Sequence, residues 1–131
     1  MKRQTKITSI WAFISLSLLI HFVLEIGEGF YYSELPKEPY GESVPTENHI
    51  IYLIAMILPL AMAFVTLFIS SKPFKIFSLV YASLLTLINA AHAIEGLVYA
   101  ISNVSQVVLL LMVVIFNISL LLQLNHWRKE E

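Results

Sequence analysis

The stretch 20–32, IHFVLEIGEGFYY, decides the fold, because it is apolar enough to lie in a bilayer and yet carries ionisable side chains. On an α-helix each residue advances by about 100°, so His21, Glu25 and Glu28 fall within an arc of about 60°. Ionised groups at bilayer depth are costly and usually face the interior of a helix bundle, where they find partners. The stretch therefore predicts a membrane helix with one inward polar stripe.

A second polar stripe lies in the stretch 89–99, NAAHAIEGLVY, which carries Asn89, His92 and Glu95. If the two helices start near residues 7 and 74 on the same side, His21 lies roughly 21 Å and His92 roughly 27 Å along its helix, at 1.5 Å per residue. The two stripes are therefore nearly level. We expect them to face each other across one site.

The composition places the chain among membrane proteins. Its 131 residues are 58% hydrophobic and 13% charged, against about 45–50% and about 25% in soluble domains. The formal net charge of -1 gives no support to nucleic-acid binding. Because cysteine is absent, disulfides, thiolate metal ligands and a cysteine nucleophile are excluded. His, Glu, Asn, Ser and Tyr side chains are left to carry any chemistry.

Apolar runs and turn signals divide the chain into four predicted helices within a single all-α domain, 1–131. We expect them at about 7–32, 49–70, 74–101 and 106–124, since roughly 20 residues span a bilayer core. An acidic loop, 33–48, separates the first two, because prolines and a glycine break both periodicities there. The first run could instead be a signal peptide, but no A-x-A-like site follows it.

The basic residues predict the orientation of this four-helix bundle. Seven of the eight Lys and Arg residues lie at the N-terminus, between the second and third helices, or at the C-terminus. Only Lys37 lies on the opposite side. By the positive-inside rule both termini are expected in the cytoplasm, and the loop 33–48 outside. The polar stripes then lie in the outer half of the membrane.

His and Glu side chains from two facing helices are the usual ligands of carboxylate-bridged metal sites in helical bundles. Neutral imidazole together with carboxylate suits zinc, iron or manganese. We therefore predict a divalent metal ion held by His21, Glu25, His92 and Glu95. Glu28 joins these four as a candidate for acid–base catalysis. Further ligand-binding candidates are polar or aromatic residues on the neighbouring faces, namely Asn89, Asn117, Tyr32 and Tyr99.

The same residues allow other functions, and the sequence leaves these open. The site could bind a small amphipathic ligand instead of a metal ion. It could act on a lipid-like substrate by metal-free acid–base chemistry, as an isomerase or hydrolase. It could couple proton exchange at Glu25 or Glu28 to small-molecule transport, which would favour a homodimer. A purely structural polar network, as in an accessory subunit, is the remaining alternative.

Two short motifs resemble those of the HXXEE-domain family, small multi-span bacterial membrane proteins of largely unknown function. The Asn-x-x-His motif is intact as Asn89-Ala-Ala-His92. The His-x-x-Glu-Glu motif is present as His21-Phe-Val-Leu-Glu25, with Leu24 in place of the first glutamate. Glu28, one turn further on, could replace it. The resemblance implies an integral protein of the bacterial cytoplasmic membrane.

A more distant resemblance is to the emopamil-binding, EXPERA-type membrane fold. It rests on a His-x-x-x-Glu helix followed by a Tyr pair, a Pro-Leu helix that ends in a basic-Pro turn, and an asparagine in the last helix. The matching residues are His21, Glu25, Tyr31, Tyr32, Pro59, Leu60, Lys72, Pro73 and Asn117. This likeness implies steroid double-bond isomerisation. The chain departs from it by lacking a glutamate on the second helix, where Glu47 in the loop is the nearest.

Overall fold

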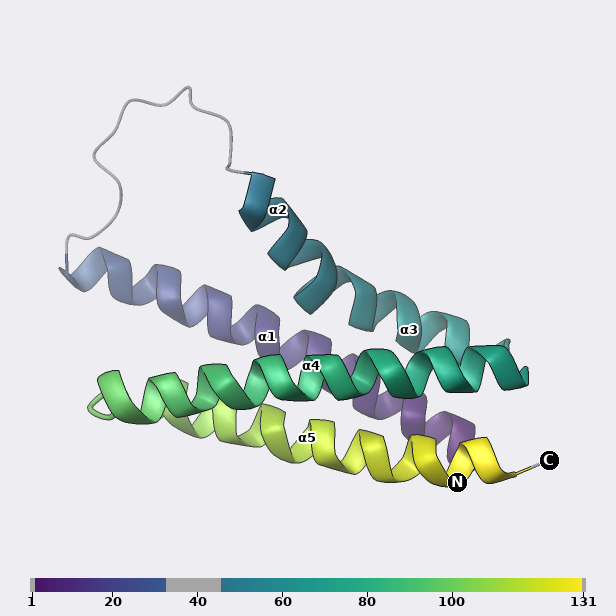
Figure 1. Ribbon diagram of the computed structural model, residues 1–131. Coiled ribbons are helices and arrows are strands. Elements are labelled where there is room, and N and C mark those ends of the chain that lie inside the picture. Colours follow the sequence, from purple (N-terminus) through teal and green to yellow (C-terminus); the bar gives the residue numbers. More distant parts are fainter. Residues whose placement is uncertain (1, 33–45, 131) are drawn as a thin grey trace.

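The computed structural model describes residues 2–32 and 46–130, and within these residues it is helical and contains no strand (Figure 1). The helices are α1 (Arg3–Tyr32), α2 (Thr46–Tyr52), the π-helical segment η1 (Leu53–Ile57), α3 (Leu58–Thr66), α4 (Lys72–Tyr99) and α5 (Val104–Lys129). We call the continuous run α2–η1–α3 the second span. The described residues thus contain four helices that are long and apolar enough to cross a membrane, which confirms the predicted fold class at this level.

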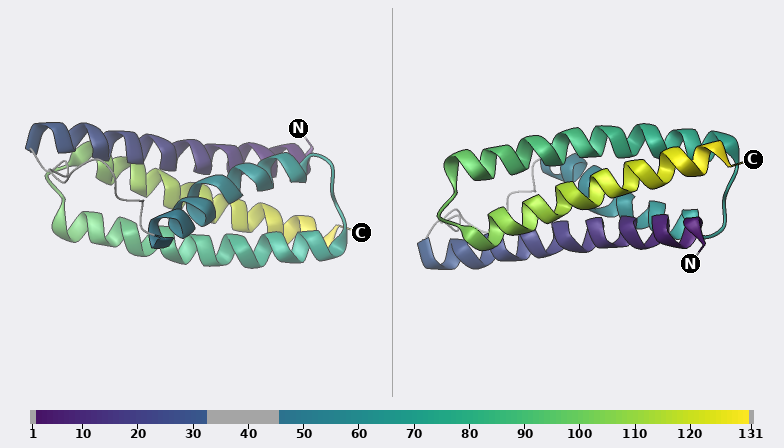
Figure 2. Two further views of the ribbon diagram at one scale, coloured as in Figure 1. Left: turned by 90° about the horizontal axis from the view of Figure 1, so that it is seen from above. Right: turned by 90° about the horizontal axis from the view of Figure 1, so that it is seen from below.

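Both chain ends lie at one end of the molecule, together with the turn between α3 and α4 (Figures 1 and 2). We call this the terminal end, and the opposite end, which holds the turn between α4 and α5, the loop end. Helix α5 packs along both α1 and α4, while the second span packs mainly on α1. A side chain at Gly96 would meet Leu110, which shows how closely α4 and α5 approach. The second span and α4 have few close approaches.

The buried core occupies the half of the molecule nearer the terminal end. On α1 it runs from Ile7 to Leu18, and Trp11 stacks on Tyr81 of α4 with ring centroids 5.3 Å apart. The core residues of α5 begin at Val113, well past the start of that helix. Towards the loop end α2 diverges from α1 and α4 (Figure 1). The sparser packing there leaves room for cavities, and the two polar stripes lie in that half.

The helix boundaries differ from those predicted for identifiable reasons. α4 begins at Lys72 instead of 74 and includes Pro73, because the first turn of a helix does not need the N–H that proline lacks. α5 extends to Lys129 instead of 124, since basic residues are favourable at a helix C-terminus. α1 begins at Arg3 instead of 7, because no helix breaker precedes the apolar run.

The second span corrects two further predictions. It ends at Thr66 instead of 70. The N–H of Leu67 bonds to the carbonyl of Phe64, three residues back, at 3.1 Å, so the α-helical pattern of four-residue spacing stops there. It begins at Thr46, so the last three residues of the predicted loop 33–48 belong to a helix. The rest of that loop, including Lys37, lies outside the described residues.

Pro59 explains the π-helical segment η1. In η1 the N–H of Leu58 bonds to the carbonyl of Leu53, five residues back. In this register residue 59 would donate to the carbonyl of Ile54, but proline has no N–H. The hydroxyl of Tyr81 on α4 donates to that carbonyl instead, at 2.6 Å. A backbone group that would be unpaired in lipid is thereby satisfied from a neighbouring helix.

We expect Tyr81→Phe to lower the free energy of unfolding by about 0.5–1.5 kcal/mol, because it removes this hydrogen bond and keeps the stacked ring. In a Pro59→Ala background the loss should shrink, since residue 59 regains an N–H that can reach the Ile54 carbonyl. A double-mutant cycle on unfolding in mixed micelles measures the difference. Equal losses in both backgrounds would show that Tyr81 does not compensate for the proline.

Candidate functional site

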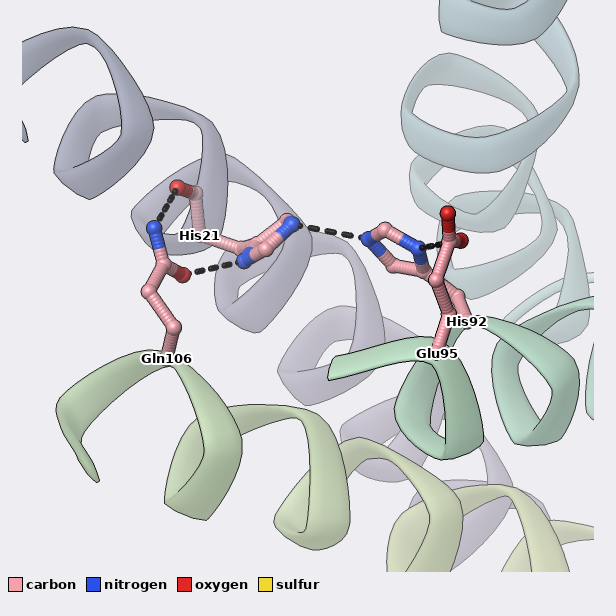
Figure 3. Close-up of polar contacts among 4 residues, drawn as sticks. All are labelled: His21, His92, Glu95 and Gln106. Atoms are coloured by element: carbon pink, nitrogen blue, oxygen red, sulfur yellow. Dashed lines mark hydrogen bonds and ion pairs between the residues drawn. The ribbon is translucent and has the colours of Figure 1, made fainter. Parts of the chain in front are cut away.

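His21 of α1 and His92 of α4 meet in the loop-end half of the molecule (Figure 3). Their Nε2 atoms are 3.0 Å apart, and the rings cross at 78° with centroids 5.0 Å apart. Most of the centroid separation is the N···N distance, so the two nitrogens face each other almost head on. The predicted convergence of the two polar stripes is confirmed for these histidines.

Gln106, in the first turn of α5, fixes the orientation of His21. Its side chain is only 5% exposed, and Asn103, which caps α5, accepts from its backbone N–H. Its Oε1 accepts from Nδ1 of His21, while its Nε2 donates to the backbone carbonyl of His21 at 3.4 Å (Figure 3). Turning the amide over would set oxygen against oxygen at that carbonyl. The two contacts therefore determine which way the amide points.

These contacts assign the hydrogen-bond donors and acceptors of the histidine pair. Because Oε1 of Gln106 can only accept, Nδ1 of His21 carries a proton, and Nε2 of a neutral His21 must then accept from Nε2 of His92. Nδ1 of His92 faces Oε2 of Glu95 at 3.4 Å. One proton therefore lies between the two Nε2 atoms and is shared by the pair. Passing it from one Nε2 atom to the other leaves the contacts with Gln106 and Glu95 in place.

A cavity of ≈ 610 Å³ opens beside the histidine pair, between α1, α4 and the α2–η1 part of the second span. Its lining combines apolar side chains with predicted site residues. The lining residues are Leu18, His21, Phe22, Glu25, Ile51, Tyr52, Ala55, Met56, Ile88, Asn89, Ala91, His92 and Glu95. Phe22 and Tyr52 also contact each other, with ring centroids 5.6 Å apart. We call this space the main cavity.

Two polar side chains of the main cavity have unused hydrogen-bonding capacity. Asn89 is 4% exposed, and its Nδ2 has no hydrogen-bond partner. Glu25 forms no hydrogen bond or ion pair with any described residue. The buried donor of Asn89 and the exposed carboxylate of Glu25 thus remain available to a bound molecule. The buried Asn89 donor is costly until something pairs with it.

Glu25 also lines two further spaces nearer the loop end. It lines both a cavity of ≈ 250 Å³ on the other side of the histidine pair and a hollow of ≈ 800 Å³ beside the α4–α5 turn. Glu28 lines these two spaces but not the main cavity, and it accepts a hydrogen bond from Nδ2 of Asn103 at 2.6 Å. The polar stripe of α1 therefore leads from the main cavity to the loop end.

The structure brings together some of the predicted site residues and separates others. His21, Glu25, Asn89, His92 and Glu95 all line the main cavity. Asn117 does not: it is fully buried, bonds to the carbonyl of Val113, and lies eleven residues along α5 from Gln106, which is about 16 Å. Tyr99 lines only the two spaces near the loop end and is 85% exposed. The side chain of Tyr32 lies outside the described part of the chain.

Gln106 and Asn103 are the site residues that the sequence did not single out. Gln106 contacts a residue 85 positions away, and Asn103 contacts one 75 positions away. Their position at the start of α5 looks like ordinary capping in the sequence, and Asn103 does cap that helix. The available signal was a glutamine on an otherwise apolar helix, at the loop-end level where both stripes were expected.

The predicted divalent metal ion stays a prediction. Among the described residues, no three His, Asp or Glu side chains are placed so that they could hold an ion together. One nitrogen of His21 is taken by Gln106, and the other points at His92 rather than beside it. An ion would have to displace the shared proton and draw Glu25 or Glu95 inwards. Elemental analysis of the purified protein tests this directly.

Comparison with known proteins finds no matching family model, no similar curated protein and no similar solved structure. The resemblances to the HXXEE-domain family and to the EXPERA-type fold therefore rest on their short motifs alone. Any conclusion about function has to come from the geometry of the site.

Proposed function

We propose that the chain is an integral membrane protein that binds a small amphipathic molecule in the main cavity. The observation that carries this proposal is the mixed apolar and polar lining of that cavity. Apolar side chains such as Leu18, Ile51 and Ile88 suit a hydrocarbon body, and His, Glu and Asn groups line the same space. The volume of ≈ 610 Å³ falls in the range typical of small-molecule sites.

The unpaired polar groups of the main cavity indicate which kind of polar head group the bound molecule would carry. Asn89 offers an N–H and Glu25 offers a carboxylate oxygen, so a head group that both accepts and donates, such as a hydroxyl or an amide, would satisfy both. The ligand would lie with this head at the histidine pair and its apolar part between the second span and α4. The few contacts between those two elements support entry from the side.

We further propose that both termini lie in the cytoplasm, with the loop end outside, in a bacterial cytoplasmic membrane. Supporting this, the Lys and Arg residues described by the structure all lie at the terminal end, whereas Glu25, Glu28 and Glu95 lie towards the loop end. Reporter fusions at Gly41 and within 72–75 test the orientation. A Gly41 fusion that reads cytoplasmic would contradict it.

Acid–base chemistry on the bound molecule is a second candidate, favoured by the shared proton. The hydrogen-bonded chain Glu95–His92–His21–Gln106 lies beside the cavity, with the proton between the two imidazoles at its centre. Such a pair can donate a proton to a substrate from one imidazole while the carboxylate balances the charge on the other. This candidate requires binding in the same place, so the binding experiment comes first.

We expect Ala55→Phe to abolish retention of the amphipathic molecule, because Ala55 lines the main cavity and a phenyl ring would fill it. Asn89→Leu should weaken retention about fivefold, the value of one lost hydrogen bond. Native mass spectrometry of protein released from mild detergent, followed by extraction and identification of the retained small molecules, measures both effects.

Ala61→Phe is the matched control for this experiment. Ala61 is exposed on the same span and does not line the cavity, so this variant should retain the ligand like the wild type. If Ala55→Phe retained the same molecules in the same amounts as Ala61→Phe, the main cavity would not be their binding site.

A further inference from the structure

The terminal end of the molecule carries two hollows lined by basic side chains. One, of ≈ 370 Å³, lies against the start of α1 and is lined by Lys2, Arg3, Lys6, Gln123 and Glu130. The other, of ≈ 350 Å³, lies between the start of α4 and the end of α5 and is lined by Ser70, Lys72, Lys75, Arg128 and Glu130. Six cationic side chains therefore surround the two hollows, with Glu130 as the carboxylate common to both.

Glu130 is already engaged. Its Oε1 forms an ion pair with Nε of Arg3 at 3.0 Å. Its backbone carbonyl accepts a hydrogen bond from Nζ of Lys75 at 2.8 Å. Among the described residues that line the two hollows, one carboxylate faces six cations, so the lining is predominantly positive.

Lys75 makes the second hollow more than a group of mobile surface lysines. The residue is 9% exposed, and its Nζ lies 5.2 Å from the centroid of the Trp127 ring. The contacts with Trp127 and with the Glu130 carbonyl hold the ammonium group in one place. An ammonium has three N–H donors, and the carbonyl uses one of them. The others remain for an anion in the hollow, which Ser70 and Arg128 also line.

We infer that these two hollows bind the phosphate of an anionic phospholipid in the leaflet at the terminal end, chiefly in the hollow around Lys75 and Arg128. Basic pockets between membrane helices are a common way of holding such head groups. A lipid suits the site better than free phosphate because exposed apolar residues adjoin its lining residues along the chain. Phe68 is 72% exposed, and Ile69 and Ile76 are also exposed, so acyl chains would have a surface to contact.

The test compares lipid affinities in nanodiscs of phosphatidylcholine with and without phosphatidylglycerol, with native mass spectrometry counting the phosphatidylglycerol retained. Arg128→Gln and Lys75→Met should each lower the affinity for phosphatidylglycerol about fivefold, the effect of one basic residue at a membrane surface. Lys75→Met keeps the alkyl chain against Trp127. Glu130→Gln should increase the affinity, because the carboxamide no longer competes for the cations.

Lys129→Gln supplies the matched control, since it removes the same charge from a neighbouring residue that lines neither hollow. If Lys129→Gln lowered the affinity for phosphatidylglycerol as much as Arg128→Gln does, the site would be overturned. Only a general attraction to anionic bilayers would then be left. A decreased affinity in Glu130→Gln would also overturn it. If inorganic phosphate raised the melting temperature in phosphatidylcholine nanodiscs as much as phosphatidylglycerol does, the ligand would be soluble phosphate and not a lipid.

Discussion

Replacing Leu85 by alanine is expected to lower the free energy of unfolding by about 2–5 kcal/mol. Leu85 is fully buried in the core at the terminal side of the main cavity, where α1, α4 and α5 pack together. Removing its side chain leaves a void that these packed helices can fill only in part. The loss of packing contacts applies in a bilayer as well, because helix association there depends on van der Waals packing.

The neighbouring Leu84 provides the control, because it is 58% exposed on the same helix. If this face contacts lipid, Leu84→Ala should change the unfolding free energy by no more than about 0.5 kcal/mol. Reversible unfolding of both variants in mixed micelles gives the comparison. Similar losses for the two substitutions would mean that α4 is rotated relative to the structure, and the position of Asn89 in the cavity would then be wrong as well.

Replacing Gln106 by leucine is expected to cost about 1–3 kcal/mol and to release the tautomer of His21. Leucine has a similar volume but leaves Nδ1 of His21 without its partner and removes the additional donor to the His21 carbonyl. Nitrogen NMR of the imidazole rings should show a proton fixed on Nδ1 of His21 in the wild type. In the variant, the proton should exchange between the two ring nitrogens.

Gln123→Leu is the control for this substitution, since Gln123 lies on the same helix and forms no hydrogen bond with a described residue. It should leave both the stability and the His21 spectrum unchanged. A His21 tautomer that stayed fixed in Gln106→Leu would contradict the role of Gln106 in setting that tautomer. Adding a chelator to the wild type tests the predicted metal ion separately. If an ion is bound, the chelator should lower the melting temperature.

The general arrangement could be predicted because it depends on helical geometry alone. A rise of about 1.5 Å and a turn of about 100° per residue placed His21 and His92 on inward faces at nearly the same level. That prediction required only the assumption that the two polar stripes face each other. It did not require knowing how the other helices are arranged. Asn89, Glu25 and Glu95 followed for the same reason.

The features that the sequence did not reveal depend on how distant helices are paired. Asn117 and Gln106 share a face of α5, but only the packing of α1 against α5 shows that Gln106 reaches His21 and Asn117 does not. The π-helical segment before Pro59 is stabilised by Tyr81, which belongs to a helix that follows later in the chain. The helix ends moved because caps and basic residues, rather than hydropathy, set them.

The weak packing between the second span and α4 has a consequence for how binding should be measured. A molecule that enters the main cavity from the side comes from the bilayer, which acts as its solvent. Occupancy would then follow the mole fraction of that molecule among the lipids instead of its concentration in water. Adding ligand-free vesicles to a reconstituted sample should therefore empty the cavity at constant total ligand, whereas diluting the same sample with buffer should leave it filled.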